Sequence, residues 1–260
     1  MTDYILYEQA EGIATITLNR PDKLNAFCEP MHVNLREKLQ EAAKSDAVRC
    51  VILTGAGRGF SAGQDLGERM MQGTDLGETL ETFYSPIIHQ IRNAPKPVIC
   101  AVNGVAAGAA ANIALACDFV IAVKSARFIE AFIKIGLMPD SGGTWFLPRL
   151  IGEARAKAMA LLGEPISAEQ AADWGLIWQA VEDEALDETV QVLAQQFANG
   201  PTIAYGLTKQ AIQAAMSQSL EAQLELEGKL QRILGNTPDY AEGVDAFNNK
   251  RPPKFTGREK

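Results

Sequence analysis

Apolar residues along the chain recur with two periods, one typical of strands and one typical of helices. Residues 3–8 and 12–18 alternate and carry β-branched side chains, which predicts a hairpin of two strands. Short apolar runs predict further strands at 49–54, 97–102 and 118–122. Helical spacing predicts helices at 30–44 and 80–91. Because strands alternate with helices, we expect a mainly parallel sheet.

The second half of the chain has a mostly helical pattern. It predicts helices at about 144–150, 153–162, 167–173, 186–199, 201–215, 219–234 and 238–248. Residues 136–145 contain too much Gly and Pro for a regular element, and the polar residues 67–77 predict a loop. We therefore expect an α/β core over residues 1–200, followed by a helical oligomerisation region over residues 201–260.

Residues 103–118 form an unusual stretch near the middle of the chain. After the apolar run 97–102, a helix is expected to begin near Gly108, and its first turns hold almost only alanine and glycine. The first N–H groups of a helix have no partner within the helix and lie at its positive end. With no side chains in the way, such a start can bind an anion or a developing oxyanion. A tightly packed core helix would show the same composition.

Composition excludes several classes of function. The chain has 260 residues, of which 47% are hydrophobic and 22% charged, and its net charge is −8. This charge argues against nucleic-acid binding, and no apolar run is long enough to span a membrane. The four cysteines are scattered, which fits a reducing, cytoplasmic location. With two histidines and no paired ligand motif, no metal site is expected. A dinucleotide-binding loop is disfavoured because Phe60 replaces its third glycine.

Three stretches carry a resemblance to a known family. They are Asn19-Arg20-Pro21 with Lys23-Leu24-Asn25-Ala26, Phe60-Ser61-Ala62-Gly63-Gln64-Asp65-Leu66, and Asn103-Gly104-Val105-Ala106-Ala107-Gly108. In this order, and together with segments 136–144 and 250–255, they resemble the enoyl-CoA hydratase/isomerase (crotonase) superfamily. The resemblance covers essentially the whole chain. It implies a spiral of β-β-α units with a C-terminal helical trimerisation region, in a homotrimer or a dimer of trimers.

The resemblance also implies the substrate and part of the site. Members bind acyl-CoA thioesters and stabilise the thioester enolate, so CoA is part of the substrate and no separate cofactor is expected. The two oxyanion donors would be the N–H groups of Gln64 and Ala109, and Asp65 would fix the loop that carries the first. Substrate contacts are expected at Lys23, Leu24, Ala26, Ala62, Gly63, Asp65, Leu66 and Gly108.

The acid and base residues decide which reaction such a site performs. The two glutamates that the hydratases of this family use fall on Asn112 and Phe132, so hydration is disfavoured. Asp140 stands where some isomerases and dehalogenases of the family have an aspartate, and a single carboxylate can move a proton from one carbon to another. Asp140 could instead be only an N-cap for the helix that follows. Glu130 is close to the second glutamate position but two residues away from it.

Among the isomerases, the chain resembles those that act on ring-1,2-epoxyphenylacetyl-CoA in phenylacetate breakdown. These enzymes form oxepin-CoA and also shift a double bond in an unsaturated acyl-CoA. We expect a dry pocket lined by Phe132, Met138 and Trp145. The alternatives are a dienoyl- or enoyl-CoA isomerase, a 4-chlorobenzoyl-CoA-type dehalogenase with His89 as its base, and a non-catalytic acyl-CoA-binding subunit.

Overall fold

The fold is described from a computed structural model that covers residues 3–67 and 75–258. Strands β1 (Ile5–Ala10) and β2 (Ile13–Leu18) form the predicted antiparallel hairpin, with Ile5 opposite Leu18. They begin a six-stranded sheet in the order β1-β2-β3-β5-β7-β10, in which all other neighbours are parallel. Its remaining strands are β3 (Cys50–Gly55), β5 (Val98–Val102), β7 (Phe119–Val123) and β10 (Gln179–Val181). The prediction of a mainly parallel sheet is confirmed.

A second, four-stranded sheet was not predicted from the sequence. It has the order β4-β6-β8-β9, with strands β4 (Gly59–Ser61), β6 (Val105–Ala107), β8 (Arg127–Ile129) and β9 (Ile166–Ser167). Each of its first three strands directly follows a strand of the large sheet, and helices connect the three pairs to one another. The chain therefore repeats a β-β-α unit, as the resemblance implies. Strands of two or three residues are too short to give a hydrophobic period, which is why the pattern did not reveal them.

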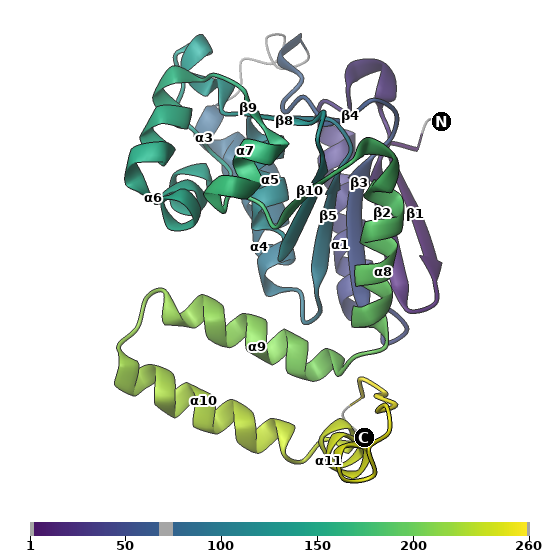
Figure 1. The fold of residues 1–260 in the computed structure, drawn as a ribbon. Helices are drawn as coiled ribbons and strands as arrows, with labels where there is room; N and C mark the ends of the chain where they lie inside the picture. Colours follow the sequence, from purple (N-terminus) through teal and green to yellow (C-terminus); the bar gives the residue numbers. More distant parts are fainter. Residues whose placement is uncertain (1–2, 68–74, 259–260) are drawn as a thin grey trace.

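Helices cover both faces of the large sheet (Figure 1). Helix α8 (Leu186–Ala198) packs on one face against β2, β3, β5 and β7. Helix α1 (Glu29–Lys44) packs on the other, beside α4 (Ser85–Asn93), which contacts α5 (Ala109–Ala116). The other helices of this part are the short α3 (Leu76–Thr79), the π-helical turn η2 (Leu80–Tyr84), α6 (Gly143–Leu162) and α7 (Ala168–Trp174). Short 3-10 turns are η1 (Pro21–Lys23), η3 (Ala131–Ile135) and η4 (Asp183–Ala185).

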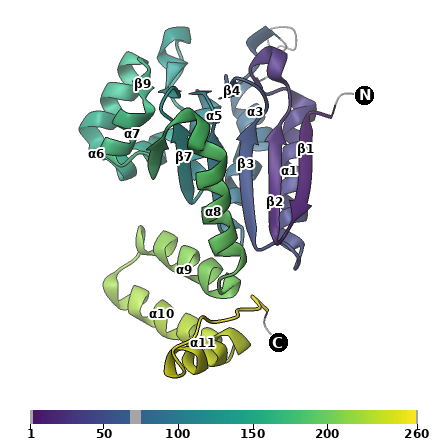
Figure 2. The same cartoon turned by 45° about the vertical axis from the view of Figure 1, so that its right-hand side comes forward.

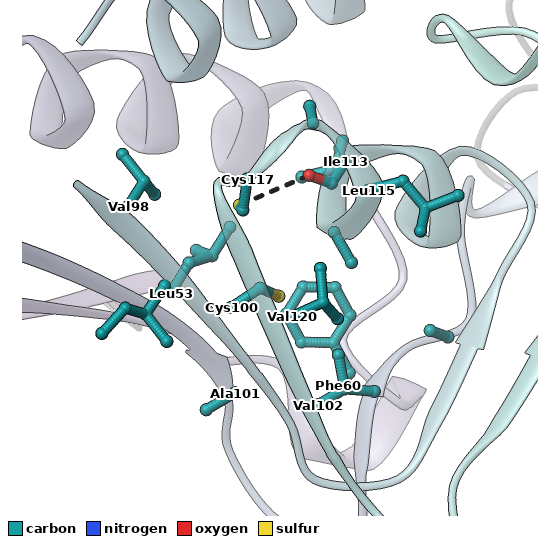
Figure 3. Close-up of a cluster of buried hydrophobic side chains, with 14 of the residues drawn as sticks. Leu53, Phe60, Val98, Cys100, Ala101, Val102, Ile113, Leu115, Cys117 and Val120 are labelled. Carbon is teal, nitrogen blue, oxygen red and sulfur yellow. Dashed lines mark hydrogen bonds between the residues drawn. The ribbon is translucent and has the colours of Figure 1, made fainter. Parts of the chain in front are cut away.

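The core lies between the sheets and α5. Figure 3 shows Leu53, Phe60, Cys100, Val102 and Val120 converging there, all buried. All residues of α5 are buried, since its small side chains allow the surrounding elements to approach closely. Burial raises the pKa of Cys100 well above its ordinary value, so this thiol is an unreactive part of the core.

The last three helices lie apart from both sheets, as Figures 1 and 2 show from two directions. They are α9 (Thr202–Ala215), α10 (Leu220–Leu234) and α11 (Pro238–Asn248). Arg49, just before β3, links them to the core: Nε donates to Thr202 Oγ1 over 3.0 Å, Nη1 to Phe255 O over 3.2 Å, and Nη2 to Gly200 O. The helical C-terminal region is thus present as expected, while the division into domains at residue 200 stays a prediction.

The helices expected at 144–150 and 153–162 are both present. They are the two parts of α6, separated by a kink at Gly152, where the backbone leaves helical geometry. The loop expected at 67–77 falls largely on residues 68–74, which lie outside the described residues; Leu76–Thr79 is helical.

Candidate active site

The candidate site lies where the parallel strands β3 and β5 pass into the small sheet. In open α/β sheets, ligands bind beyond the carboxyl ends of such strands. From β3 the chain runs through β4 into residues 62–64, and from β5 it runs through β6 to Gly108 and the start of α5. Since β4 and β6 are parallel neighbours, these two segments are brought to the same edge. The tertiary structure thereby joins two motifs that are about forty residues apart in the sequence.

Gly63 makes the closest contact between the two segments. A methyl group on Gly63 would lie 2.7 Å from Ala107 O and 3.8 Å from Ala109 N, and its φ of +86° suits only glycine well. Gly108, with φ +56°, turns the chain into α5. Among the described residues, neither the Gln64 N–H nor the Ala109 N–H donates a hydrogen bond. Two backbone donors without a partner therefore flank this contact.

Asn25 anchors the loop that carries Gly63. Its buried side chain accepts from Arg20 N over 2.8 Å and donates to Ala56 O and Gly59 O, each over 2.9 Å. Its backbone carbonyl accepts from Ser61 Oγ over 2.7 Å, and Ser61 Oγ in turn accepts from Gly63 N over 3.2 Å. A buried side chain that makes three hydrogen bonds to separate backbone groups holds its surroundings in one arrangement.

The side chains of Asp65 and Gln64 also hold the loop that carries Gly63. Asp65 forms an ion pair of 2.8 Å with Arg20, and its other oxygen accepts from Gly67 N. The Gln64 side chain donates to Phe27 O over 3.0 Å and accepts from the Tyr84 hydroxyl over 2.7 Å. Asp65 is thus placed to fix the loop through local interactions, and the side chain of Gln64 also takes part.

The segment expected to contact CoA lies beside this loop. Leu24 and Asn25 both have positive φ, and they follow the turn η1. Lys23 is exposed, Leu24 half-buried and Ala26 buried, while Ala62 and Leu66 are exposed. Ala62 N donates to Leu24 O over 2.9 Å, so the two expected CoA-contacting segments are joined directly.

Asp140 lies next to the first turn of α5. The buried Asn112 side chain donates to Asp140 O over 2.9 Å, and the Asp140 carboxylate accepts from Ser141 Oγ over 2.8 Å. Asn112 also lies 3.4 Å from an oxygen of Glu130, which is fully buried. The structure therefore brings Glu130 and Asp140 together through Asn112. It also argues against the N-cap reading, because α6 begins without a side-chain cap.

The expected dry pocket is only partly assembled in the single chain. Phe132 is buried, and its ring covers Gly108. Met138 is 67% exposed, so it does not line a dry pocket. Trp145 lies at the other end of α5, where it lines a cavity of about 580 Å³ with Leu115 and Cys117. Trp145 therefore does not join Phe132 at the start of α5, and the Arg149 guanidinium lies 4.2 Å from the centre of its ring.

Neither histidine is placed as the dehalogenase alternative requires. His89 is exposed on α4. His32 is buried among aromatic rings, stacked on Phe27 at 4.9 Å between ring centroids.

Sequence reasoning missed the supporting residues Arg20, Asn25, Ser61 and Tyr84. Arg20, Asn25 and Ser61 stand inside the motifs quoted above. The sequence therefore showed where they are but not that they support the loop. Tyr84 could have been noticed as a tyrosine on an apolar helix face, because a buried tyrosine hydroxyl normally finds a polar partner.

Residues 3–67 and 75–258 contain neither a metal-binding cluster nor a membrane-spanning helix. Over these ranges, no three His, Cys, Asp or Glu side chains gather as a metal site requires. None of the described helices combines the length and apolar character needed to cross a membrane.

Several known proteins are similar to this chain over its whole length. A family profile described as Enoyl-CoA hydratase/isomerase matches residues 8–258. The 1,2-epoxyphenylacetyl-CoA isomerase of Escherichia coli (strain K12) is 53% identical over 262 residues, covering 99% of this chain and 100% of that protein. A probable enoyl-CoA hydratase of Rhodobacter capsulatus is 50% identical, covering 98% of each.

Solved structures share the fold. A putative enoyl-CoA hydratase/isomerase from Mycobacterium abscessus superposes with a TM-score of 0.93 at 36% identity, covering 98% of this chain and 100% of that one. The profile match, the full-length relatives and the repeated β-β-α units agree with one another. The chain belongs to the enoyl-CoA hydratase/isomerase family.

Proposed function

We propose that this protein is an acyl-CoA isomerase in which Asp140 is the only acid and base. The observation that carries the proposal is the pair of free backbone donors, Gln64 N–H and Ala109 N–H, on either side of the Gly63–Ala107 contact. Removing a proton next to a thioester places negative charge on the thioester oxygen. Two fixed donors that have no other partner stabilise that charge, each by about 3 kcal/mol.

Asp140 moves the proton. Through Asn112 its backbone is held on the first turn of α5, which begins with Ala109. In a double-bond shift, the carboxylate removes a proton from the α-carbon and the enolate forms. The same carboxyl group then returns the proton to the γ-carbon, so no atom is gained or lost.

The proposed main substrate is ring-1,2-epoxyphenylacetyl-CoA, which is rearranged to its isomer oxepin-CoA. The support is the 53% identity over the full length to the Escherichia coli isomerase of that name. Phe132 over Gly108 offers an apolar surface near the reacting carbons, as a ring requires. A shift of a 3,4 double bond to the 2,3 position in an unsaturated acyl-CoA uses the same groups.

Hydration is the less favoured reaction, although one relative is described as a probable hydratase. A hydratase needs two carboxylates to hold and activate water, and the corresponding positions carry Asn112 and Phe132. An amide and a phenyl ring cannot take a proton from water.

Three further parts of the proposal concern the setting of the enzyme. CoA enters as part of the substrate, and no other cofactor is used.

The four cysteines are buried free thiols, which supports a cytoplasmic location. A homotrimer or dimer of trimers is supported by large apolar residues that the single chain leaves exposed on its last helices, namely Ile212, Met216, Leu220, Leu224, Ile233 and Phe247.

The test is to incubate the protein with a 3-enoyl-CoA in deuterated water, beside the Asp140→Asn variant. Migration of the double bond with deuterium incorporation, lost in the variant, is the expected result. The variant should still bind a CoA ester as the unmodified protein does. Asp183→Asn, which changes an exposed carboxylate on η4, serves as the control and should keep full activity. Full activity of Asp140→Asn contradicts the mechanism.

A further inference from the structure

Glu130 is a buried carboxyl group that the proposed isomerisation does not use. It follows β8, immediately before η3, and is fully buried. One of its oxygens has no hydrogen-bond partner among the described residues. The other lies 3.4 Å from Asn112 Nδ2, a long contact. An ionised carboxylate normally accepts several hydrogen bonds when buried, so this environment does not suit a charged Glu130.

Asn112 connects Glu130 to the catalytic loop. Its amide nitrogen, shared with Glu130, donates to Asp140 O over 2.9 Å. Gly143 N donates to the same carbonyl over 2.8 Å, and a methyl group on Gly143 would lie only 2.5 Å from Asn112 Nδ2. Asn112 thus has little room to move, and its contact with Glu130 limits the remaining freedom of its side chain.

The charges around Glu130 favour its protonated form. Burial is the main cause that raises its pKa, and the nearby negative charge of Asp140 adds to it, while the contact with Asn112 opposes both; the pKa is about 8. Lys134, on the adjacent η3, is exposed and pairs with Glu164 over 3.1 Å. The pKa of Glu130 is therefore set by burial, Asn112 and Asp140, and not by Lys134.

We propose that Glu130 is a positioning residue for Asp140. Its protonated carboxyl group holds the Asn112 amide, and Asn112 holds the main chain of Asp140 against the start of α5. Because Glu130 stays uncharged, it adds no second negative charge beside Asp140, where the enolate must form. This role rests on the proposed function.

The test compares the pH profiles of kcat for the unmodified protein, Glu130→Gln and Glu130→Leu, from about pH 6 to about pH 9. The unmodified protein should lose activity above about pH 8, where Glu130 ionises beside Asp140. Glu130→Gln stays neutral, so it should keep activity within about threefold at pH 7 and lose this alkaline decline. Glu130→Leu should lower kcat about tenfold and change KM less than about twofold, because substrate binding is not affected. Glu164→Gln, an exposed carboxylate nearby, should match the unmodified protein throughout.

Two results would overturn the proposal: an alkaline decline that persists unchanged in Glu130→Gln, or a Glu130→Leu variant with normal kcat. If Glu130→Leu does not fold, the Gln variant alone still decides between the outcomes. A readout independent of activity separates this proposal from the proposed function. At pH 7, the infrared spectrum of the unmodified protein should contain the carbonyl band of a protonated carboxylic acid. The spectrum of Glu130→Gln should lack this band. Without that difference the Glu130 proposal fails, whereas an unmodified protein that shows the band but turns over no enoyl-CoA contradicts only the proposed function.

Discussion

The Tyr84 hydroxyl donates a hydrogen bond of 2.7 Å to Oε1 of Gln64, the residue that follows Gly63 in the loop beside α5. Tyr84 is almost completely buried and ends a π-helical turn, a feature that often marks functional sites. The same Gln64 side chain donates to Phe27 O. A side chain expected to be unimportant therefore joins the oxyanion loop to two other elements.

The first prediction concerns this contact. Tyr84→Phe removes the hydroxyl and keeps the ring, so the Gln64 side chain loses one of its two anchors outside its own loop. We expect kcat to fall about tenfold, equivalent to about 1.4 kcal/mol of transition-state stabilisation, with little change in KM. Tyr7→Phe, at the edge strand β1, is the matched control and should keep normal kinetics. Normal kcat in Tyr84→Phe would show that the loop of Gly63 and Gln64 is held in place without the Tyr84 hydroxyl.

The second prediction concerns the backbone donors, which no side-chain deletion can test. Gly63→Ala places a methyl group 2.7 Å from Ala107 O and should push the loop away from α5. We expect a fall in kcat of about 100-fold or more, as when an oxyanion donor is lost. Gly175→Ala has a similar positive φ of +79°, but its nearest neighbour is Leu150 O at 3.7 Å. It should cost about 1 kcal/mol of stability and leave kcat unchanged.

The third prediction concerns stability and pH at Glu130. Its pKa is raised from 4.5 to about 8 in the folded protein. Between these values the folded state holds a proton that the unfolded state has lost, so stability falls as pH rises, by about 1.4 kcal/mol per pH unit. Glu130→Gln should lack this contribution. Denaturant unfolding at several pH values checks it: the stability of the variant relative to the unmodified protein should rise from about pH 5 to about pH 8, and a constant difference would contradict the prediction.

The fourth prediction concerns the buried Lys96. Its ammonium group donates to the carbonyls of Ala42, Ser45 and Val48 over 2.8–2.9 Å, at the end of α1. Lys96→Met leaves these carbonyls without their donor, so we expect a loss of about 2–3 kcal/mol in the free energy of unfolding. Lys44→Met, on the exposed last turn of α1, should change stability by less than about 0.5 kcal/mol. Similar values for the two variants would mean that water replaces Lys96 at no cost.

The sequence by itself determined five of the six strands of the large sheet, nearly all the helices and the family; the three-residue strand β10 was missed. These features depend on local periodicity and on motifs of a few neighbouring residues, and both can be recognised from the order of the residues alone. It also pointed to Gly63, Gln64, Gly108, Ala109 and Asp140, because the glycines and the aspartate stand at fixed distances within those motifs.

Only the tertiary structure decided how distant residues meet. The small sheet, which brings Gly63 to Ala109, consists of strands too short to show a period. Tyr84 reaches Gln64 across 20 residues, and Asn112 joins Glu130 to Asp140. Trp145, close to Asp140 in the sequence, lines a cavity with Leu115 and Cys117 at the other end of α5. Such contacts depend on how whole elements pack, which no local pattern of hydrophobic and polar residues specifies.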